Sequence, residues 1–169
     1  MLLDGTIFKK IMSNSSHSNV LIIGGGCAGI SVASRLHSLK SDLNISIIEP
    51  SDKSLYQAAW TLVRAGAYDV GSTIKQMSEV MPSYVKWIKE YAEEFMPETN
   101  SVKTNNGTYT YDFLVVCPGL KLNFDGVAGL KEHLGKNNVC TNYGSDMAVY
   151  TWECLKKLNG GTLLFTEPP

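Results

Sequence analysis

Residues 20–29 read Val-Leu-Ile-Ile-Gly-Gly-Gly-Cys-Ala-Gly, and residues 45–49 read Ile-Ser-Ile-Ile-Glu. These two segments constrain the fold more than any other part of the chain. Each begins with an apolar run rich in β-branched residues, which predicts a buried parallel strand. Between them, apolar residues recur at helical spacing and predict a helix over residues 28–38. The order of strand, glycines, helix and strand is typical of a Rossmann-like βαβ unit, so we expect an α/β fold with a parallel sheet.

Each glycine of the Gly24-x-Gly26-x-x-Gly29 pattern has a distinct purpose in a dinucleotide site. Gly24 permits a tight turn, Gly26 lets the backbone approach a pyrophosphate, and Gly29 lets the helix pack close to the strand. Glu49 closes the second strand where a carboxylate can bind the adenosine ribose hydroxyls, and its charge disfavours a 2′-phosphate. A bare glycine pattern also occurs in flexible loops, but the whole constellation predicts that the chain binds FAD or NAD.

The composition of the chain and the spacing of its residues argue against several classes of function. The chain is 44% hydrophobic and 18% charged, as in ordinary globular proteins. Fifteen Lys and Arg against sixteen Asp and Glu, without a block of one sign, argue against a nucleic-acid partner. No apolar stretch approaches the ~18 residues of a membrane-spanning helix. The histidines lie apart in the sequence and the cysteines form no Cys-x-x-Cys pair, so we predict no metal site. We expect the cysteines to be free thiols in a reducing compartment. The cysteines are Cys27, Cys117, Cys140 and Cys154.

Further elements follow from local patterns. The type I′ signal Asn106-Gly107 predicts a hairpin over residues 102–111. We expect Ser145 or Asp146 to cap an amphipathic helix over residues 146–158. The other predicted elements are a short buried helix within residues 55–66, strands at 84–88 and 162–165, and a buried strand at 113–117 that ends at the turn Pro118-Gly119.

The segment Glu49-Pro-Ser-x-x-x-Leu-Tyr-Gln57, followed by Trp60-Thr-Leu-Val63, resembles the block after the FAD motif in sulfide:quinone oxidoreductases. The mitochondrial-type and related bacterial members are the most similar. The resemblance continues through Pro82-Ser83-x-Val85-x-Trp87-Ile88 and Tyr111-x-Phe113-Leu-Val-Val-x-Pro118-Gly119. It therefore covers the chain from about residue 20 onward and identifies the N-terminal, FAD-binding portion of such an enzyme.

This resemblance implies FAD as the cofactor and assigns roles around it. A cradle for the pyrophosphate is implied at Gly24, Gly26, Cys27, Ala28 and Gly29. It further implies that Glu49 binds the ribose, that Gln57 reaches the flavin, that Ala92 offers backbone contacts to the adenine, and that Pro118 and Gly119 pass close to the cofactor.

In the family that the chain resembles, a cysteine pair oxidises sulfide and FAD passes the electrons to quinone at a membrane surface. Neither cysteine of that pair is present, so we expect a portion truncated before it and inactive by itself. Cys140 matches a further cysteine of one family branch and is a candidate accessory in sulfur handling; the alternative is an inert packed thiol.

The resemblance also yields a domain division and a location. We predict a disordered or targeting lead-in at 1–18, an FAD-binding domain at 19–159 with a small β-meander near 84–112, and the first strand of a truncated second domain at 160–169. The expected location is the mitochondrial inner membrane, or a bacterial cytoplasmic membrane, with peripheral attachment through segments absent here.

Two alternative functions stay open: a type II NADH:quinone oxidoreductase, and a truncated non-catalytic module that binds nucleotide or a partner.

Overall fold

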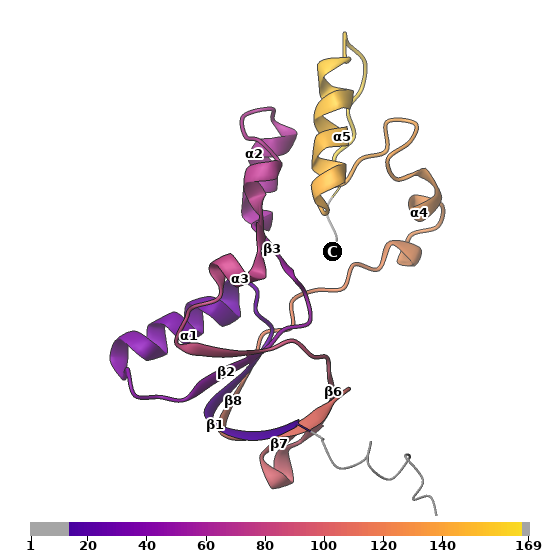
Figure 1. Ribbon diagram of the computed structural model, residues 1–169. Helices are drawn as coiled ribbons and strands as arrows, with labels where there is room; N and C mark the ends of the chain where they lie inside the picture. The colour runs from indigo at the N-terminus through magenta and orange to yellow at the C-terminus, as the bar shows by residue number, and fades with distance from the viewer. Residues whose placement is uncertain (1–13, 167–169) are drawn as a thin grey trace, which may run out of the picture. The chain divides into compact units, whose positions relative to one another are not determined.

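The computed structural model describes residues 14–166 (Figure 1). They divide into two compact units. The first contains residues 14–54 and 75–120, and the second contains residues 55–74 and 121–166. The predicted lead-in lies largely outside the described residues, whereas its last part, from Asn14, belongs to the first strand. The predicted domain boundaries remain predictions.

A six-stranded sheet forms the first unit, with strand order β5-β2-β1-β8-β7-β6. Strand β1 lies parallel to both β2 and β8, and β2 lies parallel to β5. The remaining neighbours, β6, β7 and β8, form an antiparallel meander. The strands are β1 (Asn14–Ile23), β2 (Ile45–Ile48), β5 (Val85–Ile88), β6 (Ala92–Met96), β7 (Ser101–Thr104) and β8 (Gly107–Val116), and the helices are α1 (Cys27–Leu39), α3 (Met77–Val80) and the 3₁₀ turn η4 (Pro97–Thr99).

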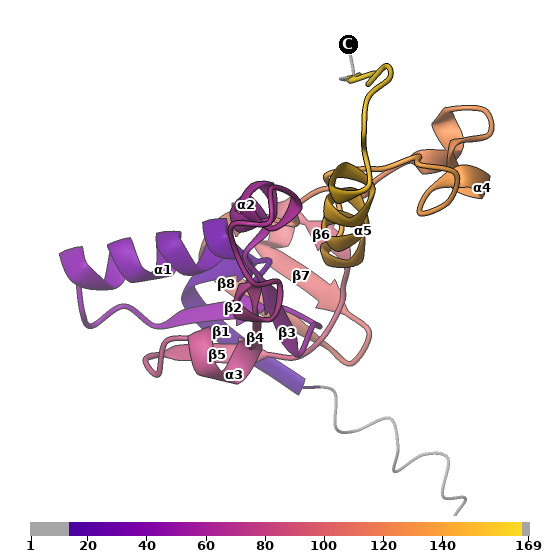
Figure 2. The same cartoon turned by 90° about the horizontal axis from the view of Figure 1, so that it is seen from above.

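Both faces of the sheet are buried around β1 because its apolar residues alternate between them. Val20 and Ile22 face α1 and pack near Ala33, which is fully buried. Leu21 and Ile23 face the opposite way and join a cluster with the meander. Figures 1 and 2 show α1 lying along one face of the sheet. Burial on both faces explains why residues 20–23 form a continuous apolar run, as the sequence indicated.

The first strand is longer than predicted. Strand β1 starts at Asn14 rather than near Val20, because its polar first half pairs with β8 from Gly107 onward. Ser18 in this half is buried and shares a hydrogen bond with the Ser46 hydroxyl at 2.6 Å. Pairing with the long strand β8 thus gives this serine-rich segment a strand conformation that its composition did not predict.

Three expectations for the meander need correction. The hairpin is present, but its turn is Asn105-Asn106, and neither of these residues nor Gly107 has a positive φ, so the turn is not type I′. The Thr104 hydroxyl instead accepts hydrogen bonds from the N–H groups of Asn106 and Gly107. The predicted buried strand at 113–117 is the second half of β8, where Phe113 is 71% exposed. Strand β5 pairs with β2 and so lies outside the meander.

The second unit is mainly helical. Its core consists of Trp60, Val63 and Ala148, which bring α2 and α5 together. Gly66 ends the α2 segment with φ +70°, and a Cβ there would lie 2.3 Å from the Trp152 ring. Its elements are η2 (Gln57–Ala59), α2 (Trp60–Arg64), η3 (Gly71–Thr73), η5 (Phe124–Gly126), α4 (Leu130–His133) and α5 (Ser145–Lys156). A two-stranded sheet of β3 (Lys53–Leu55) and β4 (Ile74–Gln76) contains the points at which the chain enters and leaves residues 55–74.

Several predictions for this unit are only partly correct. The expected helix within residues 55–66 is split into η2 and α2, and Leu55 and Leu62 are exposed rather than buried. Helix α5 is present, but Gly144 is its N-cap residue and no described side chain caps it.

The strand predicted at 162–165 is not formed, because no described segment pairs with its backbone. Its side chains Leu164 and Phe165 are 86% and 83% exposed. Among the described residues, no helix combines the length and the apolar character that crossing a bilayer requires.

Candidate nucleotide-binding site

The turn between β1 and α1 is locked by backbone contacts that only glycine permits. Gly24 has φ +100°, and its N–H donates to the carbonyl of Ile48 at 2.9 Å. A Cβ on Gly24 would lie 2.0 Å from the carbonyl oxygen of Cys117. The Cys117 N–H in turn donates to the carbonyl of Ile23 at 2.7 Å. The end of β8 therefore lies directly against the glycine turn.

Gly29 allows the close approach of helix and strand that its place in the pattern indicated. A Cβ there would lie 1.9 Å from the carbonyl oxygen of Gly24 and 3.3 Å from the Ile22 side chain. Such an overlap with backbone cannot be relieved by a side-chain rotation. Gly29 is thus required for α1 to start where it does.

Gly26 is different, because nothing in the described chain requires a glycine there. Its φ of −73° is open to any residue, and a Cβ would meet no described atom within 4 Å. Gly26, Cys27 and Ala28 are all exposed. The absence of a side chain at Gly26 leaves the backbone accessible to a ligand, as a pyrophosphate requires.

The same residues begin helix α1, which supplies donors for an anion. The first intrahelical bond is from the Ile30 N–H to the Gly26 carbonyl, so earlier N–H groups of the first turn have no partner within the helix. No described side chain caps this end, and its first turn contains no acidic residue. Together with the helix dipole, these N–H groups favour a phosphate.

Glu49 lies at the end of β2, and the backbone holds its carboxylate. Its Oε2 accepts the Gly25 N–H at 2.8 Å, and its Oε1 accepts the Ser51 N–H at 2.7 Å. The Trp87 indole N–H donates to the Glu49 carbonyl at 2.7 Å. Each carboxylate oxygen keeps a further lone pair, so the group can still accept hydrogen bonds from a ribose diol.

Sequence reasoning missed Gly25 as the residue that positions this acid. A Cβ on Gly25 would lie 2.8 Å from the Cβ of Glu49, so a larger residue would push the acid away. The sequence did contain a signal for this role. Gly25 stands at a position where the Gly-x-Gly-x-x-Gly pattern allows any residue, so a glycine there calls for a separate explanation.

The other predicted site residues are divided between the units. Pro118 and Gly119 follow Cys117 in the first unit and are exposed, and Gly119 has φ +77°. Ala92 opens β6 opposite Thr104, beside a bulge in the same unit. Gln57, exposed in η2, and Cys140 belong to the second unit. The structure thus brings together the glycine turn, Glu49 and the end of β8.

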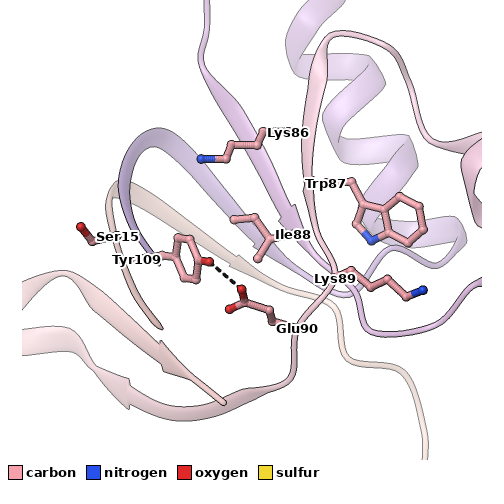
Figure 3. Close-up of a pocket in the computed structure, with 7 residues that line it drawn as sticks. All are labelled: Ser15, Lys86, Trp87, Ile88, Lys89, Glu90 and Tyr109. Carbon is pink, nitrogen blue, oxygen red and sulfur yellow. Dashed lines mark hydrogen bonds between the residues drawn. The ribbon is translucent and has the colours of Figure 1, made fainter. Parts of the chain in front are cut away.

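A hollow of about 300 Å³ lies in the first unit beside Glu90 (Figure 3). Glu90 is buried, and its carboxylate accepts hydrogen bonds from the Tyr109 hydroxyl at 2.9 Å and the Thr104 hydroxyl at 2.5 Å. Trp87 lines this hollow and also binds the Glu49 carbonyl. None of the predicted cofactor residues lines it, so it is separate from the site at the glycine turn. The described residues contain no cluster of His, Cys, Asp or Glu suited to a metal ion.

Comparisons with known proteins place this geometry in a family. The model of the pyridine nucleotide-disulphide oxidoreductase family matches residues 18–146. The mitochondrial sulfide:quinone oxidoreductase of Dictyostelium discoideum is 43% identical over 154 residues, and that of Mus musculus is 34% identical over 154 residues. These matches cover 89% and 90% of this chain but 34% of each relative. The chain therefore spans about a third of the length of these curated relatives.

Solved structures and a second enzyme class give further matches. The sulfide:quinone oxidoreductase structure from the hyperthermophilic bacterium Aquifex aeolicus aligns with a TM-score of 0.66 and 28% identity, over 84% of this chain and 32% of that chain. The type II NADH:quinone oxidoreductase of Staphylococcus haemolyticus is 30% identical over 118 residues, which is 68% of this chain and 29% of the relative. These findings confirm the predicted Rossmann-like fold, the resemblance to sulfide:quinone oxidoreductases and the predicted family of FAD-dependent oxidoreductases.

Proposed function

Because this chain belongs to the pyridine nucleotide-disulphide oxidoreductase family, we propose that it is the FAD-binding part of a sulfide:quinone oxidoreductase. The observation that carries the proposal is the open backbone at Gly26, which adjoins an uncapped helix end. The sulfide:quinone oxidoreductase of D. discoideum matches more of the chain, at higher identity, than the type II NADH:quinone oxidoreductase of S. haemolyticus does. This difference favours the first enzyme class.

In this proposal the first unit holds the ADP half of FAD. The N–H groups around Gly26, Cys27 and Ala28 bind the pyrophosphate, and the fixed Glu49 carboxylate accepts the ribose hydroxyls. Its negative charge disfavours a 2′-phosphorylated nucleotide. Gly24 and Gly29 act indirectly by fixing the turn. Backbone contacts from Ala92 to the adenine, the passage of Pro118 and Gly119 beside the cofactor, and an approach of Gln57 to the flavin complete the proposed set.

Bound FAD would supply a flavin that accepts an electron pair from sulfide sulfur and passes it on to quinone. The residues of the proposed set bind and orient it, and none of them belongs to the cysteine pair that oxidises sulfide in the family. We therefore propose that these 169 residues do not by themselves catalyse sulfide-dependent quinone reduction. Purified chain supplied with FAD, sulfide and a soluble quinone should show no turnover above a protein-free control. Robust turnover would overturn this part of the proposal.

A ligand series tests the binding proposal. The purified chain would be titrated with FAD, with ADP and with FMN, which lacks the adenylate half, and binding would be followed by calorimetry. We expect saturable binding of FAD, competition by ADP and no competition by FMN. Binding should be too weak for FAD to remain stoichiometric through gel filtration, because these 169 residues span only about a third of the length of the curated relatives. Failure of both FAD and ADP to bind would contradict the proposal, and so would FMN competing as well as ADP.

We also propose a mitochondrial location, with peripheral association at the inner membrane. The support is that the D. discoideum and M. musculus relatives are both named mitochondrial. Fractionation of source cells with an antibody to this chain tests it. We expect the protein with the inner-membrane fraction and its release by alkaline carbonate washing. Recovery with another compartment would contradict the location without affecting the FAD proposal.

A further inference from the structure

Two cysteines of the second unit lie on elements that hydrogen bonds hold together. The segment 138–141 is docked on helix α5 at both of its ends. The Asn138 N–H donates to the Tyr150 hydroxyl at 3.2 Å, and the Thr151 hydroxyl donates to the Thr141 carbonyl at 3.4 Å. Cys140 lies between these two anchors, so its side chain is confined beside this part of α5.

Cys154 is the residue of α5 placed to meet it. It follows Tyr150 and Thr151 by four and three positions, and residues with these spacings share one face of a helix. The Cys140 thiol donates a hydrogen bond to the Asn138 carbonyl at 3.7 Å, and Cys154 raises the pKa of both the Cys140 thiol and the Tyr150 hydroxyl, as a thiol beside these two groups does. Both cysteines are half-buried and free, so a small reagent can reach them.

We propose that Cys140 and Cys154 form a reversible dithiol–disulfide pair that low-molecular-weight disulfides oxidise, and whose closure links segment 138–141 covalently to α5. This inference is independent of FAD binding and of the proposed sulfide oxidation, because it rests only on residues of the second unit. The family pattern places neither cysteine in the catalytic pair.

The oxidation proceeds by two thiol–disulfide exchanges. One protein thiolate attacks the small disulfide, forms a mixed disulfide and releases one small thiolate. The second protein thiolate then attacks the protein sulfur of that mixed disulfide and releases the other small thiolate. The two protons lost by the protein thiols protonate the two released thiolates. In balance, two protein thiols are oxidised to one disulfide and one small disulfide is reduced to two thiols.

The sequence makes the product easy to detect. Trypsin cleaves after Lys136 and Lys156 but nowhere between them, so one peptide, residues 137–156, carries both cysteines. The purified chain would be treated with oxidised glutathione, alkylated under denaturing conditions, digested and weighed by mass spectrometry. We expect this peptide without alkyl groups and lighter than the dithiol form by two hydrogen atoms. Reduction by dithiothreitol before alkylation should restore two alkylated thiols.

Two variants and an internal control sharpen the result. In Cys154→Ser the second exchange is impossible, so glutathione bound to Cys140 should accumulate about tenfold above its level in the wild type. In Cys140→Ser, glutathione bound to Cys154 should accumulate in the same way. Exposed Cys27 lies on the first unit and should keep its glutathione adduct in all three proteins. Persistent glutathione on Cys140 of the wild type, or two alkylated thiols after oxidation, would overturn the proposal whether or not the variants fold.

Discussion

The backbone N–H of Gly25 donates to Oε2 of Glu49 at 2.8 Å, so the glycine turn after β1 and the acid after β2 hold each other in place. The Ser51 N–H fixes the other carboxylate oxygen. Glu49 is consequently oriented before any ligand arrives, and binding need not include the cost of ordering it.

Glu49→Gln tests whether this fixed charge selects the nucleotide. The amide keeps the shape of the side chain but loses the charge and presents an NH₂ group to one of the two backbone donors. We expect weaker ADP binding by about tenfold, and a smaller preference for ADP over its 2′-phosphorylated form. Competition titrations with both nucleotides measure the preference. A preference equal to that of the wild type would show that Glu49 does not contact the ribose.

Gly29→Ala should destabilise the first unit severely. The new methyl group would lie 1.9 Å from the Gly24 carbonyl oxygen, so helix α1 must move away from the strand. We expect a loss on the order of 3 kcal/mol in the free energy of unfolding, measured by urea denaturation. Ser31→Ala, on the exposed side of the same helix, is the matched control and should change little. Equal stability of the two variants would refute the close packing at Gly29.

Trp60 and Thr73 form a buried link in the second unit. The indole N–H donates to the Thr73 hydroxyl at 3.1 Å, and that hydroxyl donates to the Val70 carbonyl at 2.7 Å. Thr73→Val removes both bonds and leaves the indole N–H and the Val70 carbonyl without partners, which we expect to cost about 2 kcal/mol. Trp60→Phe removes only the first bond but also opens space at the core, so a double-mutant cycle is needed to isolate the link. A coupling energy near zero in thermal unfolding would contradict it.

The reactivity of Cys140 should depend on pH in a defined direction. Burial first, and then the hydrogen bond with Cys154, raise the pKa of the Cys140 thiol, whereas the hydrogen bond with Thr151 lowers that pKa. Because the thiolate is the reactive form, alkylation of Cys140 should be slow at neutral pH and accelerate as the pH rises. Cys154→Ala should shift this profile to lower pH, and Thr151→Val to higher pH. Iodoacetamide kinetics followed on the peptide 137–156 measure both shifts; shifts of the same sign would contradict the assignment.

The parts of the fold that the sequence predicted are those whose causes are local. Strands β1 and β2, helix α1 and the acid at Glu49 each follow from a short pattern of apolar residues, glycines and charge. The serine-rich start of β1 could not be read in this way, because its strand conformation depends on pairing with β8, far along the chain. Likewise the turn at Asn105-Asn106 forms because Thr104 binds its N–H groups, a contact that outweighs the Asn-Gly signal beside it.

The same contrast between local patterns and contacts distant in sequence applies to the candidate site. The glycine pattern predicted the turn and a distinct purpose for each of its three glycines. Gly24 and Gly29 are needed because backbone oxygens lie where their Cβ atoms would be. At Gly26, by contrast, a Cβ would meet no described atom within 4 Å. The role of Gly25 was hidden, since the residue it positions, Glu49, is distant in sequence.

Gly26→Ser tests the central claim most directly, because serine at this N-cap position is compatible with the fold. Its Cβ meets no described atom within 4 Å, and its hydroxyl can cap helix α1. The measurement is the FAD dissociation constant of this variant and of the wild type, with thermal unfolding recorded on both. We predict an unchanged or higher unfolding temperature together with FAD binding weakened by about tenfold or more, because the side chain occupies the approach to the pyrophosphate. Wild-type FAD affinity in a stably folded Gly26→Ser protein would contradict the claim that the open backbone at Gly26 is the cofactor site.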